Sequence, residues 1–191
     1  MHGWVAHKCG DDTALHAGRL TFNPLAHLDP IGTLCLMFGP IGWAKPVPVD
    51  PTNFAYETRR RDEILVSGAG VTANFAMGIG FALILRFFGE TLYATSQVGP
   101  ILFEIVLMAT YINFALAIFN LLPIPPLDGS HILRNLLPLN AAIIYASYRR
   151  YGMFVLIGLI LGSRFVAQAT GVSLLGYPIL KLLKFFSGYE F

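Results

Sequence analysis

Charged residues are scarce in this sequence. Asp, Glu, Lys and Arg together make up 13% of the 191 residues, about half the share found in a typical globular domain. Hydrophobic residues make up 55%, and the mean hydropathy is +0.61. This imbalance argues against a soluble domain and predicts a multi-pass membrane protein. The net charge is only +2 and the basic residues form no run longer than residues 59–61, so we expect no nucleic-acid partner.

Cysteine is also scarce. Cys9 and Cys35 lie far apart and match no spacing that is typical of a metal site, so we interpret both as free thiols. The first thirty residues, roughly the reach of a signal peptide, lack its apolar core, and we expect no cleavable signal. The length is sufficient for one compact membrane bundle, and we expect a single membrane-embedded domain over residues 1–191.

Apolar runs, by contrast, are long and frequent. Three of them are long enough to cross a bilayer as helices, at residues 66–88, 101–122 and 151–168. The first would be about 35 Å long and carries small residues that allow close helix packing. Residues 31–41 and 174–186 are too short to span. The sequence therefore predicts an all-α polytopic membrane protein, a bundle of transmembrane helices with a re-entrant or extended segment near residues 31–50.

The basic residues indicate how the chain is oriented. Residues 59–61 precede the first predicted span, and Arg149 and Arg150 precede the third. The connection between the first two spans has no Lys or Arg. The positive-inside rule places both basic groups in the cytoplasm of a cell whose plasma membrane the chain crosses several times.

The most informative stretch is residues 120–129, Asn-Leu-Leu-Pro-Ile-Pro-Pro-Leu-Asp-Gly. Its three prolines cannot continue a helix, so the backbone opens at the end of an apolar segment. Asp128 lies just past this break. An ionisable residue at membrane depth is a candidate functional group. The simpler alternative is a surface turn in which Asp128 caps the next helix.

Asp128 could share a metal ion with histidines. His131 lies three residues further, on the same face of a helix that starts at Asp128. Two or three histidines with Asp128 would make an open zinc site of the catalytic kind. Spacing alone does not choose among the more distant candidates, which are His2, His7, His16 and His27.

Residues 120–129 resemble the Asn-x-x-Pro-x-Pro-x-x-Asp-Gly signature of the site-2 proteases, a family of intramembrane zinc metalloproteases. Other parts of the chain follow the family's order up to about residue 137, and residues 49–66 leave no room for an inserted PDZ domain. The chain is most similar to the small prokaryotic members. The further matching stretches are residues 2–4, 10–11, 18–21, 23–25, 29–30, 32–33, 42–49 and 67–74.

One part of the family pattern is incomplete. The family's metal motif is His-Glu-x-x-His followed by Gly, and His2-Gly3 matches only its end. The resemblance therefore assigns His2 and Asp128 as metal ligands. It places the first histidine and the general-base glutamate before Met1, so that no catalytic base lies in this chain. Relative to the family, the domain is truncated at its N-terminus.

The resemblance implies hydrolysis of peptide bonds in membrane-spanning substrates, with Zn²⁺ as cofactor and a hydroxide formed on the metal as nucleophile. The partners would be transmembrane protein substrates in the lipid bilayer, and Asn74 and Asn120 are candidates for holding the unwound substrate backbone. The motif would be complete if the coding sequence began upstream with His-Glu-x. An inactive homologue that binds substrates or regulators is one alternative, and a small membrane carrier that uses Asp128 and Glu104 is another.

Overall fold

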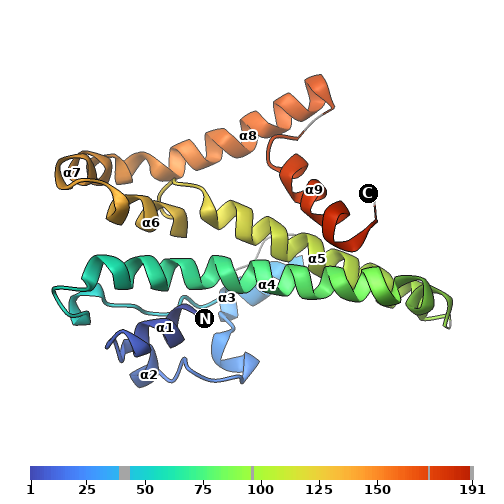
Figure 1. Cartoon of the computed structure of the whole chain (residues 1–191), viewed down its shortest axis with the longest axis horizontal. Coiled ribbons are helices and arrows are strands. Elements are labelled where there is room, and N and C mark those ends of the chain that lie inside the picture. Colours follow the sequence, from blue (N-terminus) through green and yellow to red (C-terminus); the bar gives the residue numbers. More distant parts are fainter. Residues whose placement is uncertain (39–43, 96, 172, 190–191) are drawn as a thin grey trace. The chain divides into compact units, whose positions relative to one another are not determined.

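The regular elements of this protein are helices (Figure 1). A computed structural model describes residues 1–38, 44–95, 97–171 and 173–189. Among these residues the extended backbone pairs only in an isolated antiparallel bridge between Leu28 and Ala44. The predicted all-α class is therefore confirmed. The chain divides into two compact units, residues 1–69 and 70–191, and the single domain stays a prediction.

The first unit is built from short helices and the start of a long one. Its core is formed by Ala6, Phe54 and Val66, which are all buried. Cys9 packs against this core, and both cysteines are free, as predicted. The elements are α1 (His2–Lys8), α2 (Thr13–His16), η1 (Pro24–His27), α3 (Pro30–Phe38), η2 (Pro51–Asn53) and the beginning of α4 (Arg59–Ala94).

The segment predicted near residues 31–50 has two parts. The nine residues of α3 form a helix about 14 Å long, too short to span a membrane, and residues 45–50 belong to no helix or strand. Residues 39–43, which include the Gly39-Pro40 interruption, lie outside the described residues. The buried Arg19 links segments of the first unit that are far apart along the chain. Its guanidinium donates to the carbonyl oxygens of Ala26, Lys45 and Pro46.

Among the described residues, three helical segments are long and apolar enough to cross a membrane: α4, α5 (Gly99–Leu121) and Leu139–Thr170. The third consists of α7 (Leu139–Ser147), η3 (Tyr148–Tyr151) and α8 (Gly152–Thr170). The predicted spans are thus confirmed, but α4 has 36 residues and is much longer than the apolar run inside it. A helix of that length measures about 54 Å, so its charged first turn can extend beyond the hydrocarbon layer.

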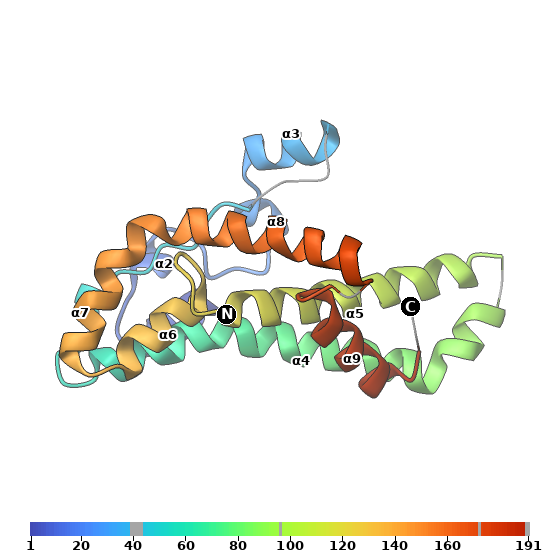
Figure 2. The same cartoon turned by 90° about the horizontal axis from the view of Figure 1, so that it is seen from above.

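Phe114 on α5 is the centre of the second unit's core. It is fully buried and packs with Ala82 of α4 and with Ile179 and Leu183 of α9 (Gly176–Ser187). A Cβ on Gly78 would lie 2.7 Å from the Phe114 ring, which confirms at this position the predicted close packing on small residues. Figure 2 shows α9 beside α5. Residues 174–186, too short to span, therefore contribute Ile179 and Leu183 of α9 to the core of the second unit.

Candidate functional site

The proline-rich segment joins α5 to α6 (Asp128–Leu136) by a tight turn. The predicted helix break is confirmed: α5 ends at Leu121 and the next residues leave the helical conformation. The Ile124 N–H donates to the Leu122 carbonyl at 2.8 Å, and the Leu127 N–H donates to the Ile124 carbonyl at 2.9 Å. These bonds give the segment a defined shape between the two helices.

Close packing holds this turn on both sides. A Cβ on Gly129 would lie 2.1 Å from the Leu121 carbonyl oxygen, so only glycine allows the start of α6 to approach the end of α5 this closely. Gly152, at the start of α8, approaches the Pro125 carbonyl oxygen in the same way. The Tyr145 hydroxyl donates to the Pro123 carbonyl at 2.9 Å. The turn that precedes Asp128 is therefore positioned by α5, α7 and α8 together.

Asp128 is the first residue of α6. Its N-cap is Leu127, so Asp128 is not the helix cap that the simpler interpretation supposed. The carboxylate is half-buried and lies in the first turn of α6. His131 lies one turn further on the same helix, where it lines a polar cavity whose walls do not include Asp128.

His2 lies at the start of α1, half-buried in the first unit. Its Nδ1 is 2.8 Å from the Val66 carbonyl oxygen. A carbonyl oxygen only accepts, so Nδ1 carries the hydrogen and the neutral ring has its lone pair on Nε2. Histidines that bind metals usually donate their other ring N–H in this way. The arrangement suits the role that the sequence assigns to His2.

The remaining histidine candidates of the first unit have local structural roles or are exposed. His7 Nδ1 pairs with the Asp12 carboxylate at 2.5 Å, and His27 Nε2 donates to the Thr21 carbonyl at 2.9 Å. His16 is exposed at the end of α2. Over the part of the chain that the structure describes, no three His, Cys, Asp or Glu side chains gather as a metal-binding group.

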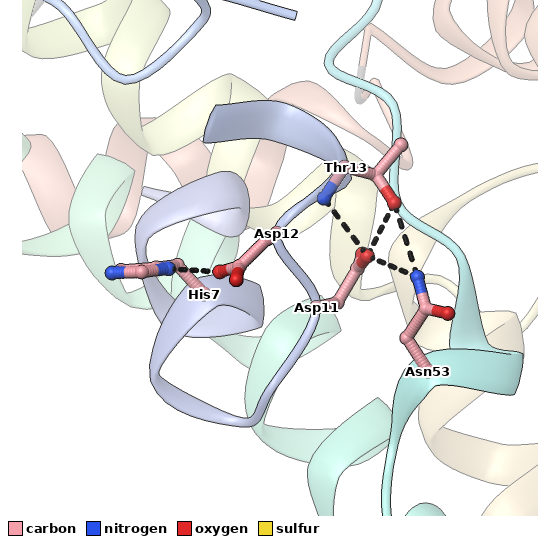
Figure 3. A network of polar contacts seen from close by, with 5 residues as sticks. All are labelled: His7, Asp11, Asp12, Thr13 and Asn53. Atoms are coloured by element: carbon pink, nitrogen blue, oxygen red, sulfur yellow. Dashed lines mark hydrogen bonds and ion pairs between the residues drawn. The ribbon is translucent and has the colours of Figure 1, made fainter. Parts of the chain in front are cut away.

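A buried carboxylate that the sequence analysis missed organises the first unit. Asp11 accepts hydrogen bonds from the backbone N–H and hydroxyl of Thr13 and from Asn53 Nδ2 at 2.8 Å (Figure 3). It also accepts one from the Asp50 N–H at 2.8 Å. Burial opposes ionisation, but these hydrogen bonds outweigh it and lower the pKa of Asp11 below its ordinary value of 3.8. In the sequence, the position of Asp11 two residues before Thr13, the first residue of α2, could have indicated the contact with Thr13. No local pattern indicated the contacts with Asp50 and Asn53.

Replacing Asp11 with Ala should lower the free energy of unfolding of the first unit by about 2–3 kcal/mol, because buried donors lose their acceptor. Hydrogen exchange of the α1 and α2 amides in the whole protein measures this loss. Asp12→Ala is the matched control, since Asp12 is exposed and should change exchange little. Because the folded pKa is lowered, the Asp11 contribution is present above pH 3.8 and is lost as the pH falls through the lowered pKa. Equal protection in the two variants would contradict this role.

Comparison with known proteins gives the family. The sequence profile described as "Peptidase family M50" matches residues 91–163. The protein named "Putative zinc metalloprotease YwhC" from Bacillus subtilis (strain 168) is 39% identical over 157 residues, which cover 81% of this chain and 70% of that protein. The chain belongs to peptidase family M50, the family of the site-2 proteases. The resemblance of residues 120–129 is thereby confirmed.

Two further similar proteins share the name "Putative zinc metalloprotease Rip2". The one from Mycolicibacterium smegmatis is 25% identical over 165 residues, covering 84% of this M50 chain and 60% of that protein. The one from Mycobacterium tuberculosis (strain H37Rv) is 29% identical over 133 residues, which cover 67% of this chain and 48% of that protein. No solved structure matches the chain.

Two side chains of this M50 chain have donor atoms that suit zinc. The His2 tautomer and the carboxylate of Asp128 are of the right kind, but an M50-type zinc site needs three protein ligands. Within residues 1–38, 44–95, 97–171 and 173–189, no three such donors gather as a group. Burial and the nearby Asp62 raise the pKa of the Cys9 thiol above its ordinary value.

His2 and Asp128 lie in different units, so their sharing of one ion stays a prediction. The two proposed substrate-binding residues both lie in the second unit. Asn74 is half-buried on α4, and Asn120 is half-buried at the end of α5, immediately before the proline-rich turn. Their contact with a substrate also stays a prediction.

Proposed function

We propose that this M50 protein is an intramembrane zinc metalloprotease that hydrolyses peptide bonds of membrane-spanning substrates. The observation that carries the proposal is the position of Asp128, a carboxylate at the proline-broken end of an apolar helix. Membership of the M50 family supports metalloprotease chemistry. In the part of the chain that the structure describes, three helices are long and apolar enough to span a bilayer, and they support a multi-pass protein of the cell membrane.

The proposal gives the chain's own residues two tasks. His2 and Asp128 supply two of the ligands for zinc, which when bound would activate water and polarise a carbonyl group. The substrate helix has to unwind locally, because its carbonyl groups are otherwise occupied by hydrogen bonds four residues along. Asn74 and Asn120 carry amides that donate and accept, so they can replace the bonds that the unwound backbone loses. In the family pattern, the remaining histidine and the general-base glutamate belong to the His-Glu-x-x-His motif whose last histidine matches His2.

Zinc analysis of the purified protein tests the proposed centre. The 191-residue chain should hold much less than one zinc per molecule, and the chain extended by His-Glu-Xaa before Met1 should hold about one, because three ligands are needed. An extension of Ala-Glu-Xaa is the matched control and should not raise the zinc content. If the His-Glu-Xaa form binds no more zinc than the control, the proposed ligand set is wrong.

The second candidate function is that of an inactive homologue that binds membrane-spanning proteins without cutting them. It is favoured by the absence of a three-donor group among the described residues. A chain of this kind would retain a transmembrane peptide in detergent, with binding weakened by Asn120→Ala, and would leave it intact even in the zinc-loaded extended form. Cleavage by the extended form would exclude this alternative.

A further inference from the structure

A small cavity lies in the second unit, between α6, the end of α7 and the proline-rich turn. Its volume is about 150 Å³. Figure 2 shows α7 at the turn between α6 and α8. The residues that line it are Pro125, Pro126, Ser130, His131, Arg134, Tyr145, Ala146 and Arg149. The cavity belongs to neither the proposed zinc ligands nor the proposed substrate-binding residues.

The charged residues that line this cavity are all basic. It contains the guanidinium groups of Arg134 and Arg149, the imidazole of His131 and two hydroxyl groups, and none of its eight lining residues is acidic. Arg134 and His131 also make other interactions, whereas Arg149 is exposed on η3, so the argument depends on Arg149. A guanidinium presents paired N–H donors that match the oxygens of a phosphate group. The lining therefore favours a phosphate anion.

The position of Arg149 relative to the membrane indicates where the phosphate comes from. The 19 residues of α8 make a helix about 28 Å long, close to the thickness of the hydrocarbon layer. Arg149 belongs to the candidate segment Leu139–Thr170, but α8 alone is long enough to cross. A crossing by α8 would place its first residue, Gly152, at the membrane surface and Arg149 just outside it. Basic pockets between membrane helices on the cytoplasmic side bind anionic headgroups. The positive-inside rule predicts this same side for Arg149.

We propose that this cavity binds the phosphate group of an anionic membrane lipid. Pro125 and Pro126 form part of the wall, and the Pro123 carbonyl is held by Tyr145, another lining residue. A bound headgroup therefore contacts the turn that positions Asp128. The proposal does not depend on catalysis or on zinc, because the cavity is formed entirely by residues of the second unit.

Native mass spectrometry of the full chain in detergent tests this proposal by titration with phosphatidylglycerol. Arg149→Gln should weaken binding by about tenfold or more, because a charge-assisted hydrogen bond is lost. Arg150→Gln is the matched control. It removes the same charge from the neighbouring position, but Arg150 stacks on Tyr151 and does not line the cavity. The control should bind like the original protein. Thermal unfolding without lipid should be the same for both variants, since both side chains are exposed.

Two further ligands, phosphatidylcholine and inorganic phosphate, distinguish a lipid headgroup from a free phosphate ion. Phosphatidylcholine, whose headgroup has no net charge, should bind at least about tenfold more weakly than phosphatidylglycerol. Inorganic phosphate should compete with phosphatidylglycerol for the original protein. If inorganic phosphate binds and the anionic lipid gives no gain over phosphatidylcholine, the lipid assignment is overturned. Equal loss of binding in Arg149→Gln and Arg150→Gln overturns the cavity itself as the site, because general surface charge would then explain the binding.

Discussion

Asp128→Asn should abolish zinc binding and peptide hydrolysis in the form of the protein that carries His-Glu-Xaa before Met1. The substitution keeps the shape of the side chain but removes the negative charge that a zinc ligand provides. Loss of an outer-shell partner already costs about 10–100-fold in metal affinity, so we expect loss of a direct ligand to cost more than about a hundredfold. The helix-dipole interaction that is also lost is worth only about 0.3–1 kcal/mol, and the protein should stay folded.

Glu104→Gln provides the control for this experiment. Glu104 is an exposed carboxylate on the apolar helix α5, and it is not a proposed ligand. Zinc content by mass spectrometry and cleavage of a transmembrane peptide should both be retained in Glu104→Gln. Loss of activity in both variants with zinc unchanged would instead favour a carrier that uses both intramembrane charges.

Gly129→Ala should destabilise the junction between α5 and α6. The new methyl group would lie 2.1 Å from the Leu121 carbonyl oxygen and 2.6 Å from that of Leu122, both of which are backbone atoms that cannot rotate away. We expect the free energy of unfolding to fall by about 2–3 kcal/mol, which is typical of overpacking at a closely packed site. Asp128 is the adjacent residue, so zinc content in the extended form should fall as well.

The matched control for this substitution is Gly158→Ala on α8. A Cβ at Gly158 meets no atom of the described chain within 4 Å, and alanine favours a helix by about 0.8–1 kcal/mol over glycine. Unfolding in mixed micelles with increasing sodium dodecyl sulfate compares the two. A destabilised Gly129→Ala beside an unchanged or more stable Gly158→Ala is the expected result. Equal stability of the two variants would contradict the close approach of α5 and α6.

The local sequence pattern predicted one helix boundary correctly and another only in part. The predicted break before Asp128 is correct because proline excludes a helix through its own geometry, whatever surrounds it. The length of α4 was underestimated because hydropathy measures what can enter lipid, and a helix continues into water when its charged residues are good helix formers. The start of α4 at Arg59 therefore lies outside the apolar run.

Some residues of the candidate site could be named from the sequence, and others only from the structure. His2 and Asp128 were named from the sequence, and the structure adds the bond from His2 to Val66, which selects the tautomer. The Asp11 network was missed because two of its partners lie 39 and 42 residues away, at Asp50 and Asn53. Hydrogen bonds over such separations leave no periodicity in the sequence.

Composition and proline placement by themselves determined that this chain is an all-helical membrane protein with a carboxylate at a broken helix end, because hydrophobicity and backbone geometry act on each residue locally. Tertiary structure alone decided that Gly129 and Gly152 allow the turn to be held from both sides, and that Arg149 reaches a cavity shared with Arg134. These arrangements join segments that are distant along the chain, so they exist only once the helices have packed.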